Sequence, residues 1–448
     1  MTQIQTAPAF VEKVQEAFHI FEQNTQNHPF AKIHSLRKEA ISKFAEMGFP
    51  TTKHEEWKYT NLKKLIASDF SLQSKKSIET DIQNFISKNF DDCLYDGFLL
   101  VFINGQFSAK HSIASDNQIV IGNLASSYSK HESIIKNYLG KVSDYQSSVF
   151  HALNMAFVWD GAFVYVPNNK AIEKPIWILH ITDNQDSNIL SQLRNLIVLE
   201  ENAEATVVEQ TLVLGKEKSF LNKVSEVFVG KNARLKHYLL QDEGENGIQV
   251  SNTQMRQLDG SIYDNFTFSL GDSLGNALIR NNLNLLLDGE RCEGNMYGLY
   301  MLSGNSHVDN HTSVDHLKPH SQSNEMYKGV MDGKSTGVFN GKIFVRPHAQ
   351  KTNAFQSNRN ILLSEQATID TKPQLEIWAD DVKCSHGATV GALDTEPLFY
   401  LKARGIPEKK AKALLTFAFA MDLIEKVKLE PLKKLVENKV MAQLGYEE

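Results

Sequence analysis

Paired cysteines are missing from this sequence. Its 448 residues contain three cysteines, Cys93, Cys292 and Cys384, which lie far apart and form no CxxC or CxxH pattern. This spacing indicates neither a disulfide framework nor a self-contained zinc or cluster site. We therefore expect a protein of the reducing cytoplasm.

A strong charge of one sign and long apolar runs are missing as well. The chain has 47 basic and 53 acidic side chains and a formal net charge of -6, which gives no global field that would collect nucleic acid or an anionic membrane. No segment approaches the ~18 apolar residues that a membrane helix needs. The first residues carry Glu12 and Glu16 within their apolar pattern and lack the layout of an export signal. We expect protein or small-molecule partners, and neither nucleic acid nor membrane.

A convincing catalytic set is also missing. Residues 329–335, GVMDGKS, end like a phosphate-binding loop, but three residues separate the two glycines where that loop needs four. The residues that follow predict a strand, whereas a phosphate loop leads into a helix. We expect no ATP binding by this chain. The lack of a carboxylate pair, a Ser-His-Asp order or a GxGxxG after a strand favours a scaffold over an enzyme.

Helical patterns dominate the first part of the chain. Apolar residues recur at steps of three or four at Phe10, Val14, Phe18 and Phe21, and we expect an N-terminal helical domain over residues 1–95. A β core is expected over residues 96–382, with a helical insertion at about residues 128–157.

A repeat of nearly constant length runs through the β core. Turn signals at Asn202, Asn232, Gly260 and Gly289 are separated by 30, 28 and 29 residues and are joined by short β runs. Such a repeat predicts a solenoid in which each coil buries its inward side chains against its neighbours. The next marker, Gly333, lies 44 residues after Gly289, so the number of coils stays open. A β-sandwich, whose turns come about every 8 to 12 residues, is the alternative.

Helices are predicted in the C-terminal domain, residues 383–448. Asp394 can cap a first helix that Gly405 ends, and further helices follow Pro407 and Pro431. A solenoid exposes sheet edges at its ends, and we expect this tail to cover one of them. The surplus apolar side chains of the tail form either a docking surface or a seal on that end. They are Phe399, Tyr400, Leu401, Phe417 and Phe419.

Four histidines in the second half of the chain superficially resemble a metal site. His307, His311, His316 and His320 lie close in sequence to Asp309 and Asp315. On a strand, the odd step from His311 to His316 places these two side chains on opposite faces. We interpret the four as hydrogen-bonded or solvated structural histidines.

Cys384 and His386 form the most pointed local feature. Two residues apart on an extended segment, their side chains share one side and could bind one metal ion. Two ligands are too few to hold iron or a cluster, so the others would have to come from elsewhere, such as another chain. A buried structural cysteine is the alternative interpretation.

Several long segments resemble the SufB/SufD family of iron-sulfur cluster assembly proteins. They are EEWKYTNL (55–62), YKGV (327–330), GVFNGKI (337–343), AQKTNAFQSNRNILLS (349–364), CSHGATVGALD (384–394) and LFYLKARGI (398–406). Their order matches that of the family over nearly the whole chain. Within the family, Gly387 and the length of 448 residues resemble the SufD branch, because the SufB branch usually has Glu at that position and a longer chain.

This resemblance implies a right-handed parallel β-helix flanked by helical domains, acting as a non-catalytic scaffold in a complex with SufB and the ATPase SufC. His386, and with it Cys384, would face SufB where a transient Fe-S cluster is assembled, and His386 would be a transient metal ligand. Reduced FAD is implied for the complex as a whole, and no residue here locates it. The SufC-binding residues would be Leu398, Phe399, Tyr400, Leu401, Arg404 and Gly405.

The resemblance leaves Cys93 and Cys292 without a matching motif, and we interpret both as structural. An isolated chain is expected to pair with a second copy through the β-helix edge. Two alternatives stay open for the function. One is a SufB-like paralogue that acts as the main cluster scaffold. The other is a stand-alone β-helix enzyme acting on polysaccharides, which would need charged residues gathered in one groove and is commonly exported.

Overall fold

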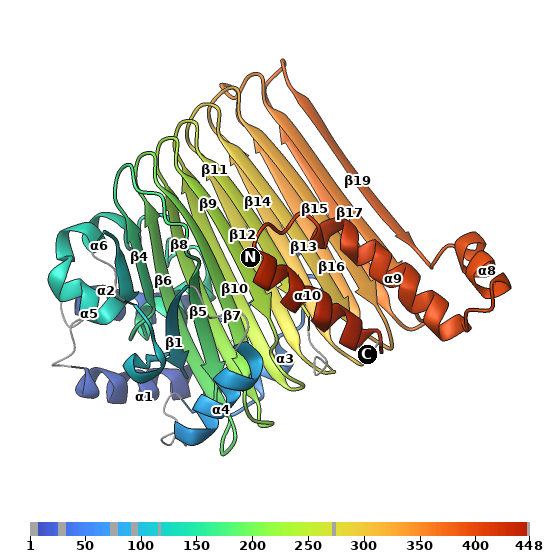
Figure 1. Ribbon diagram of the computed structural model, residues 1–448. Coiled ribbons are helices and arrows are strands. Elements are labelled where there is room, and N and C mark those ends of the chain that lie inside the picture. Colours follow the sequence, from blue (N-terminus) through green and yellow to red (C-terminus); the bar gives the residue numbers. More distant parts are fainter. Residues whose placement is uncertain are drawn as a thin grey trace.

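A parallel β-solenoid forms the centre of the protein (Figure 1). The computed structural model describes residues 8–25, 33–71, 79–90, 97–114, 118–270 and 275–445. Between residues 163 and 391 the chain makes about eight turns, and each full turn adds one strand to each of two sheets. The predicted solenoid flanked by helices is therefore confirmed, and the β-sandwich is not what the chain forms.

The strands alternate between the two sheets along most of the chain. Odd-numbered strands from β5 onward join β1 and β2 in a ten-stranded sheet, and even-numbered strands from β4 onward join β3 in a nine-stranded sheet. The pairs are parallel except for β1–β2 and β3–β4. The strands are β1 (Phe98–Ile103), β2 (Gln106–Phe107), β3 (Val120–Asn123), β4 (Ala162–Val166), β5 (Ile176–Thr182), β6 (Ile189–Leu199), β7 (Glu204–Val213), β8 (Ser219–Val229), β9 (Arg234–Gln241), β10 (Gly247–Gln257), β11 (Ile262–Ser269), β12 (Leu278–Leu287), β13 (Glu293–Leu302), β14 (His307–His316), β15 (Gln322–Met331), β16 (Thr336–Val345), β17 (Asn353–Leu362), β18 (Thr368–Ile377) and β19 (Lys383–Gly391).

One row of turns carries the repeat. From the β4–β5 turn to the β16–β17 turn, each turn from an even to the next odd strand contains one residue in the left-handed conformation, at steps of 28 to 33 residues. The backbone N–H of this residue donates to a carbonyl in the next coil, as from Asn202 to Lys231 at 2.8 Å. Short polar residues and glycine enter this conformation most readily. The seven residues are Asn169, Asn202, Asn232, Gly260, Arg291, His320 and Lys351.

Gly333 belongs to the opposite row of turns, which explains the irregular 44-residue step. It has φ of 66° and lies between β15 and β16, and its counterpart Gly304 has φ of 61° between β13 and β14. The repeat itself continues through Arg291, His320 and Lys351, which are not typical turn residues. The markers therefore disappear from the sequence while the coil length is kept.

Three hydrophobic clusters hold the fold together. One fills the interior of the solenoid, and the other two lie on the outer faces of the sheets under helices. The nine-stranded sheet is covered by α1 (Pro8–Asn24), α2 (His34–Met47), α5 (Leu124–Lys130), α6 (Glu132–Tyr138) and α7 (Val149–Ala156), and the ten-stranded sheet by α4 (Glu79–Phe90), α9 (Glu408–Ile424) and α10 (Glu430–Gln443). Helices α5 to α7 occupy the region where a helical insertion was expected, and α3 (Lys63–Ile66) lies in the N-terminal part.

The helical insertion is attached to the solenoid by a buried ion pair. Arg194 on β6 and Glu226 on β8 are both fully buried, with the Arg194 Nη2 and Glu226 Oε1 atoms 2.6 Å apart. Glu226 also accepts the backbone N–H of Gly140 at 2.9 Å, and Arg194 donates to Asn154 on α7 at 3.2 Å. This network fixes where the insertion lies on the sheet.

The prediction that the tail covers an end of the solenoid is wrong. Helices α9 and α10 lie along the outer face of the ten-stranded sheet (Figure 1), where Leu423, Leu432 and Val436 pack in one cluster with Tyr238 and Phe266. The apolar stripe of these helices packs on the apolar outer side chains of the sheet, and the face of the sheet therefore takes the tail.

The tail also begins later than expected. Residues 383–391, which were assigned to the helical C-terminal domain, form β19 and extend the ten-stranded sheet. Helix α8 (Thr395–Ala403) follows; Asp394 caps it by accepting the N–H of Glu396 at 3.0 Å, and Gly405 ends it with φ of 84°. Both of these residues have the roles that the sequence predicted.

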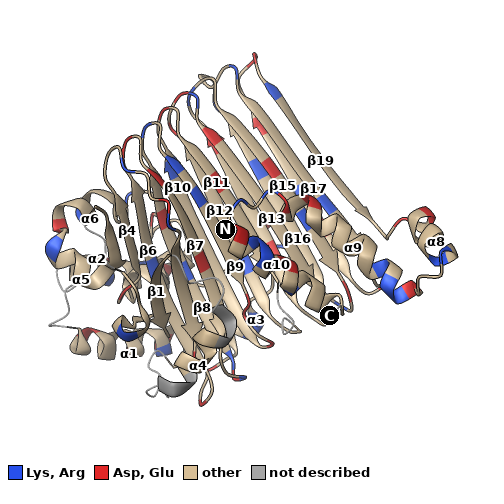
Figure 2. Cartoon of the chain, in the orientation of Figure 1, with Lys and Arg blue, Asp and Glu red and all other residues tan. Residues whose placement is uncertain are grey.

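Charged side chains are spread over the molecule. Figure 2 shows basic and acidic segments mixed along the turns that join the strands. No helix among the described residues combines the length and the apolar character required to cross a membrane.

Candidate functional site

The last strand of the solenoid has a free edge. β19 lies at the end of the ten-stranded sheet and pairs in parallel with β17, and the structure describes no strand on its other side. Cys384 lies opposite Ala354 and His386 lies opposite Gln356 in this ladder. Unpaired N–H and C=O groups along such an edge can accept a strand from another chain.

Cys384 and His386 share the inward face of this last strand. Cys384 packs against the interior cluster, and burial raises the pKa of its thiol. His386, two residues on, projects to the same side because strand side chains alternate, and it is exposed because no further coil covers it. The shared side predicted from the sequence is therefore present. No group of three or more His, Cys, Asp and Glu side chains suited to a metal ion forms among the described residues.

Helix α8 exposes its large side chains. Phe399 is 73% exposed and Tyr400 is 57% exposed, and Arg404 lies over the Tyr400 ring at 5.2 Å. None of the helix residues is buried, and Figure 1 shows α8 beyond the sheets, following the end of β19. These aromatic side chains therefore do not seal the solenoid. They form a surface with Leu398, Leu401 and Gly405, the other residues that the family resemblance singled out.

The four histidines near β14 separate as the strand alternation predicted. His307 and His311 lie on the outer face of β14, where His307 contacts the Thr60 hydroxyl at 2.8 Å and His311 contacts Asp309 at 3.1 Å. His316 is on the inner face and contacts the Ser323 hydroxyl at 2.9 Å. His320 lies in the turn that follows. The structural interpretation is therefore confirmed for His307, His311 and His316.

The family segment at residues 55–62 is a strap across the outer face of the nine-stranded sheet. Glu56 pairs with Lys342 on β16 and with His311 at 3.3 Å, and these contacts, His311 first, lower its pKa to about 2. The Arg280 guanidinium lies 4.5 Å from the centre of the Trp57 ring. Arg280 also pairs with the buried Asp309; burial opposes ionisation there, but Arg280 and His311 outweigh it and lower the pKa of Asp309.

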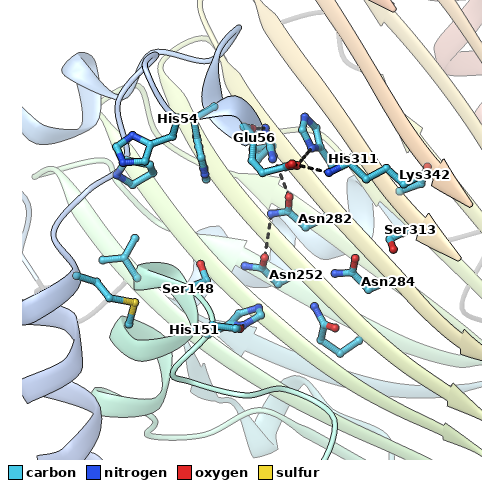
Figure 3. Close-up of a pocket in the computed structure, with 18 of the residues that line it drawn as sticks. His54, Glu56, Ser148, His151, Asn252, Asn282, Asn284, His311, Ser313 and Lys342 are labelled. Atoms are coloured by element: carbon cyan, nitrogen blue, oxygen red, sulfur yellow. Dashed lines mark hydrogen bonds and ion pairs between the residues drawn. The ribbon is translucent and has the colours of Figure 1, made fainter. Parts of the chain in front are cut away.

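A pocket of about 680 Å³ lies between this strap, the start of α7 and the sheet (Figure 3). Its floor is a row of amides in which Asn282 donates to Asn252 at 2.9 Å. The cations that could hold the phosphates of a flavin dinucleotide, Arg280 and Lys342, are already paired with Asp309 and Glu56. The pocket therefore does not fit the flavin that the family resemblance implied, and we assign no flavin site.

The GVMDGKS segment and Cys292 have structural roles. The GVMDGKS segment forms the end of β15 and a turn, and the residues that follow form β16, so the predicted strand is confirmed. Cys292 is buried and its thiol donates to the carbonyls of Gly289 at 3.2 Å and Leu258 at 3.3 Å; burial raises its pKa. Cys93 lies outside the described residues.

Sequence analysis missed the polar side chains inside the last coils. Gln356, Asn358 and Asn360 are buried on the inner face of β17, and Glu325 is buried one coil earlier. The alternation of polar residues in NAFQSNRN was the available signal. By itself, this pattern of polar residues suggests a strand face in contact with solvent. The strand register shows instead that these side chains point into the solenoid.

Comparisons with known proteins place these features in a family. The family description "SUF system FeS cluster assembly, SufBD core domain" matches residues 180–419, and "SufBD protein N-terminal region" matches residues 11–178. The chain is 33% identical over 438 residues to the iron-sulfur cluster assembly protein SufD of Escherichia coli, covering 96% of each chain. It is 33% identical over 407 residues to an iron-sulfur cluster assembly SufBD family protein of Synechocystis, covering 89% of this chain and 88% of that one. It is 27% identical over 429 residues to SufD of Bacillus subtilis, covering 92% and 94%.

Proposed function

Because the chain belongs to the SufBD family of the SUF system for iron-sulfur cluster assembly and is SufD-like, we propose that it is a non-catalytic scaffold subunit. It pairs with a SufB-type subunit through its last coil and binds a SufC-type ATPase through α8. A nascent Fe-S cluster is the cargo of this complex, and this chain binds no ATP itself.

The free edge of β19 carries this proposal. A strand of another chain can add to this edge and thereby come close to Cys384 and His386. These two side chains supply two donors, and a cluster needs more. A partner that adds a strand and further ligands would complete the site at the interface. His386 is then a transient ligand of the assembling cluster, and Cys384 lies beside it.

The exposed face of α8 supports the ATPase contact. Aromatic residues and arginine are the side chains that most often dominate the binding energy of an interface. Phe399 and Tyr400 lie on this short helix and Arg404 follows it directly, and no residue of the helix is buried. When no partner is present, the free β19 edge pairs with a second copy of the chain.

The first test is copurification of this chain with a SufB-type and a SufC-type subunit, followed by anaerobic iron and sulfide analysis. We expect a stable three-component complex in which iron and sulfide appear only after assembly. Replacing Phe399 and Tyr400 together by Ala should remove the ATPase but leave the SufB-type subunit bound. The control is Trp378→Ala. Trp378 is another exposed aromatic residue (50%), and it lies directly after β18 and not on α8. Loss of the ATPase in the control as well would contradict the assignment to α8.

The second test concerns His386. His386→Ala should leave the complex stoichiometric and folded while lowering the iron and sulfide that it holds. His348→Ala is the matched control, since His348 is an exposed histidine in the turn before β17. Normal cluster loading in the His386→Ala complex would show that this side chain has no role, and iron bound by the chain alone would overturn the shared site.

A further inference from the structure

Three inward-facing residues form a column under the free end of the solenoid. The strand register places Glu325 on β15 beside Gln356 on β17, and Gln356 beside His386 on β19. In parallel strands, side chains at paired positions lie on the same face, about 4.8 Å apart along the stack. The column therefore leads from the buried interior to the exposed imidazole.

The amide of Gln356 is held in place from below. Its Nε2 atom donates to Glu325 Oε2 at 2.6 Å, and both side chains are almost completely buried. Gly341 on β16 makes room for this arrangement, because a Cβ atom there would lie 2.2 Å from Gln356 Nε2. Any larger residue at position 341 would displace the amide.

The oxygen of the same amide is unsatisfied. Gln356 Oε1 is buried and has no hydrogen-bond partner among the described residues. A buried acceptor without a partner costs about 1 to 3 kcal/mol, and native proteins rarely leave one without a reason. One N–H of the amide is committed to Glu325, and the oxygen is the acceptor that the amide has left to offer to a further group.

We propose that Gln356 is a positioning residue for His386: its free amide oxygen accepts a ring N–H of His386, and Glu325 fixes the amide in the orientation that permits this. The inference rests on the proposed role of His386 at the partner interface and adds the means by which its ring is oriented. A neutral imidazole that donates one N–H keeps its lone pair on the other nitrogen. That nitrogen then faces away from the solenoid, toward the partner, and is ready to bind a metal.

The two residues under His386 have distinct tasks in this arrangement. Gln356 selects the tautomer, in the way that carbonyl and carboxylate groups behind metal-binding histidines do. Glu325 is paired with Gln356 in the strand register and not with His386. It therefore acts on His386 only by holding the amide of Gln356. A substitution that keeps a hydrogen-bond acceptor at position 325 should therefore be tolerated, whereas one at position 356 that removes the amide should not.

The test is nitrogen-15 NMR of the full chain labelled on histidine, which reads the tautomer of each imidazole. The His386→Gln variant identifies the signals of His386. One tautomer should dominate in the wild type, and in Gln356→Met, which is close in size, the ratio of tautomers should fall by up to tenfold, the factor that one net hydrogen bond supplies. An unchanged ratio in folded Gln356→Met would overturn the proposal.

Two further variants strengthen the design. Glu325→Gln keeps an oxygen that can accept from Gln356 and should retain the wild-type ratio; a loss as large as that in Gln356→Met would mean that the charge at 325 matters, and would refute the assigned task. If Gln356→Met lowers the yield of folded protein, Gln356→Asn provides a second route, because its shorter amide cannot span the same distance. The Asn variant should lose the tautomer preference too, and retention would count against the proposal.

Cluster loading of the assembled complex separates this inference from the proposed function. Gln356→Met should lower iron and sulfide in the complex less than His386→Ala does, because the imidazole is still present. If His386→Ala has no effect while Gln356→Met still changes the tautomer, the proposed function fails and the positioning contact stands. If His386→Ala lowers cluster loading but the tautomer ratio of His386 is unchanged in Gln356→Met, the proposed function stands and this inference fails.

Discussion

The carboxyl group of Glu243 should make the protein less stable as the pH rises from 4.5 to about 7. Glu243 lies in the connection between β9 and β10 and is buried. Burial is the main cause that raises its pKa from 4.5 to about 7. The folded chain therefore binds this proton more tightly than the unfolded chain does, and between pH 4.5 and 7 folding stability falls with rising pH.

The size of the effect follows from the two pKa values. The difference between 4.5 and 7 corresponds to about 3 kcal/mol of stability, present in full below pH 4.5 and lost above pH 7. Glu243→Gln replaces the carboxyl by a neutral group of the same shape. We expect the variant to match the wild type within ~0.5 kcal/mol at pH 4 and to exceed it by ~3 kcal/mol at pH 8.

The assay is urea unfolding of wild type and variant at several values of pH. Comparing the two cancels the opposite trend from His151, His180 and His316, whose pKa values burial lowers to about 4, 3 and 4. Glu245→Gln is the matched control, because Glu245 is an exposed residue of the same connection. A constant difference for Glu243→Gln between pH 4 and pH 8 would refute the reasoning.

Three more substitutions test the packing described above. Arg194→Met should cost about 3 to 5 kcal/mol by urea unfolding, because it leaves the Glu226 carboxylate buried without its partner, and the double variant with Glu226→Gln should recover part of the loss. Gly298→Ala should cost about 1 to 3 kcal/mol in the same assay, since its new Cβ would lie 2.2 Å from the buried Tyr327 ring; an unchanged midpoint would show that the ring can move. Trp57→Ala should free the strap and speed tryptic cleavage after Lys58, and equal cleavage rates would mean that the ion pairs hold the strap without the ring.

The regular part of the solenoid could be predicted because its coils repeat. The markers at Asn202, Asn232 and Gly260 are residues that favour the left-handed conformation, and each occupies the same place in its coil. The later coils could not be counted because Arg291 and Lys351 adopt that conformation without any compositional signal. Contacts with neighbouring coils override local preference there.

The position of the tail helices illustrates a different limit. Amphipathic periodicity in α9 and α10 predicted two helices with an apolar side, and both are present. Periodicity does not say which surface that side covers. The outer side chains of β9 and β11, such as Tyr238 and Phe266, decide it, and these two residues precede the start of α9 (Glu408) by 170 and 142 residues.

Only the part of the candidate site that lies on the last strand, β19, could be predicted from the sequence. Cys384 and His386 are two residues apart, so strand alternation alone puts them on one side. Gln356 and Glu325 are separated from His386 by whole coils, and their relation to it depends on the register of three strands. A local pattern carries no information on that register.

The junction between β19 and α8 has a mechanical consequence. Only residues 392–394 separate the end of the strand from the first turn of the helix. A protein that grips α8 and moves therefore pulls on β19 through a very short tether. Tension along the strand is shared by all nine residue pairs of the β17–β19 ladder, which resist shear together and carry the coil as a rigid body. Tension across the strand instead peels the pairs apart one after another, and the first pair to open would be the one nearest α8.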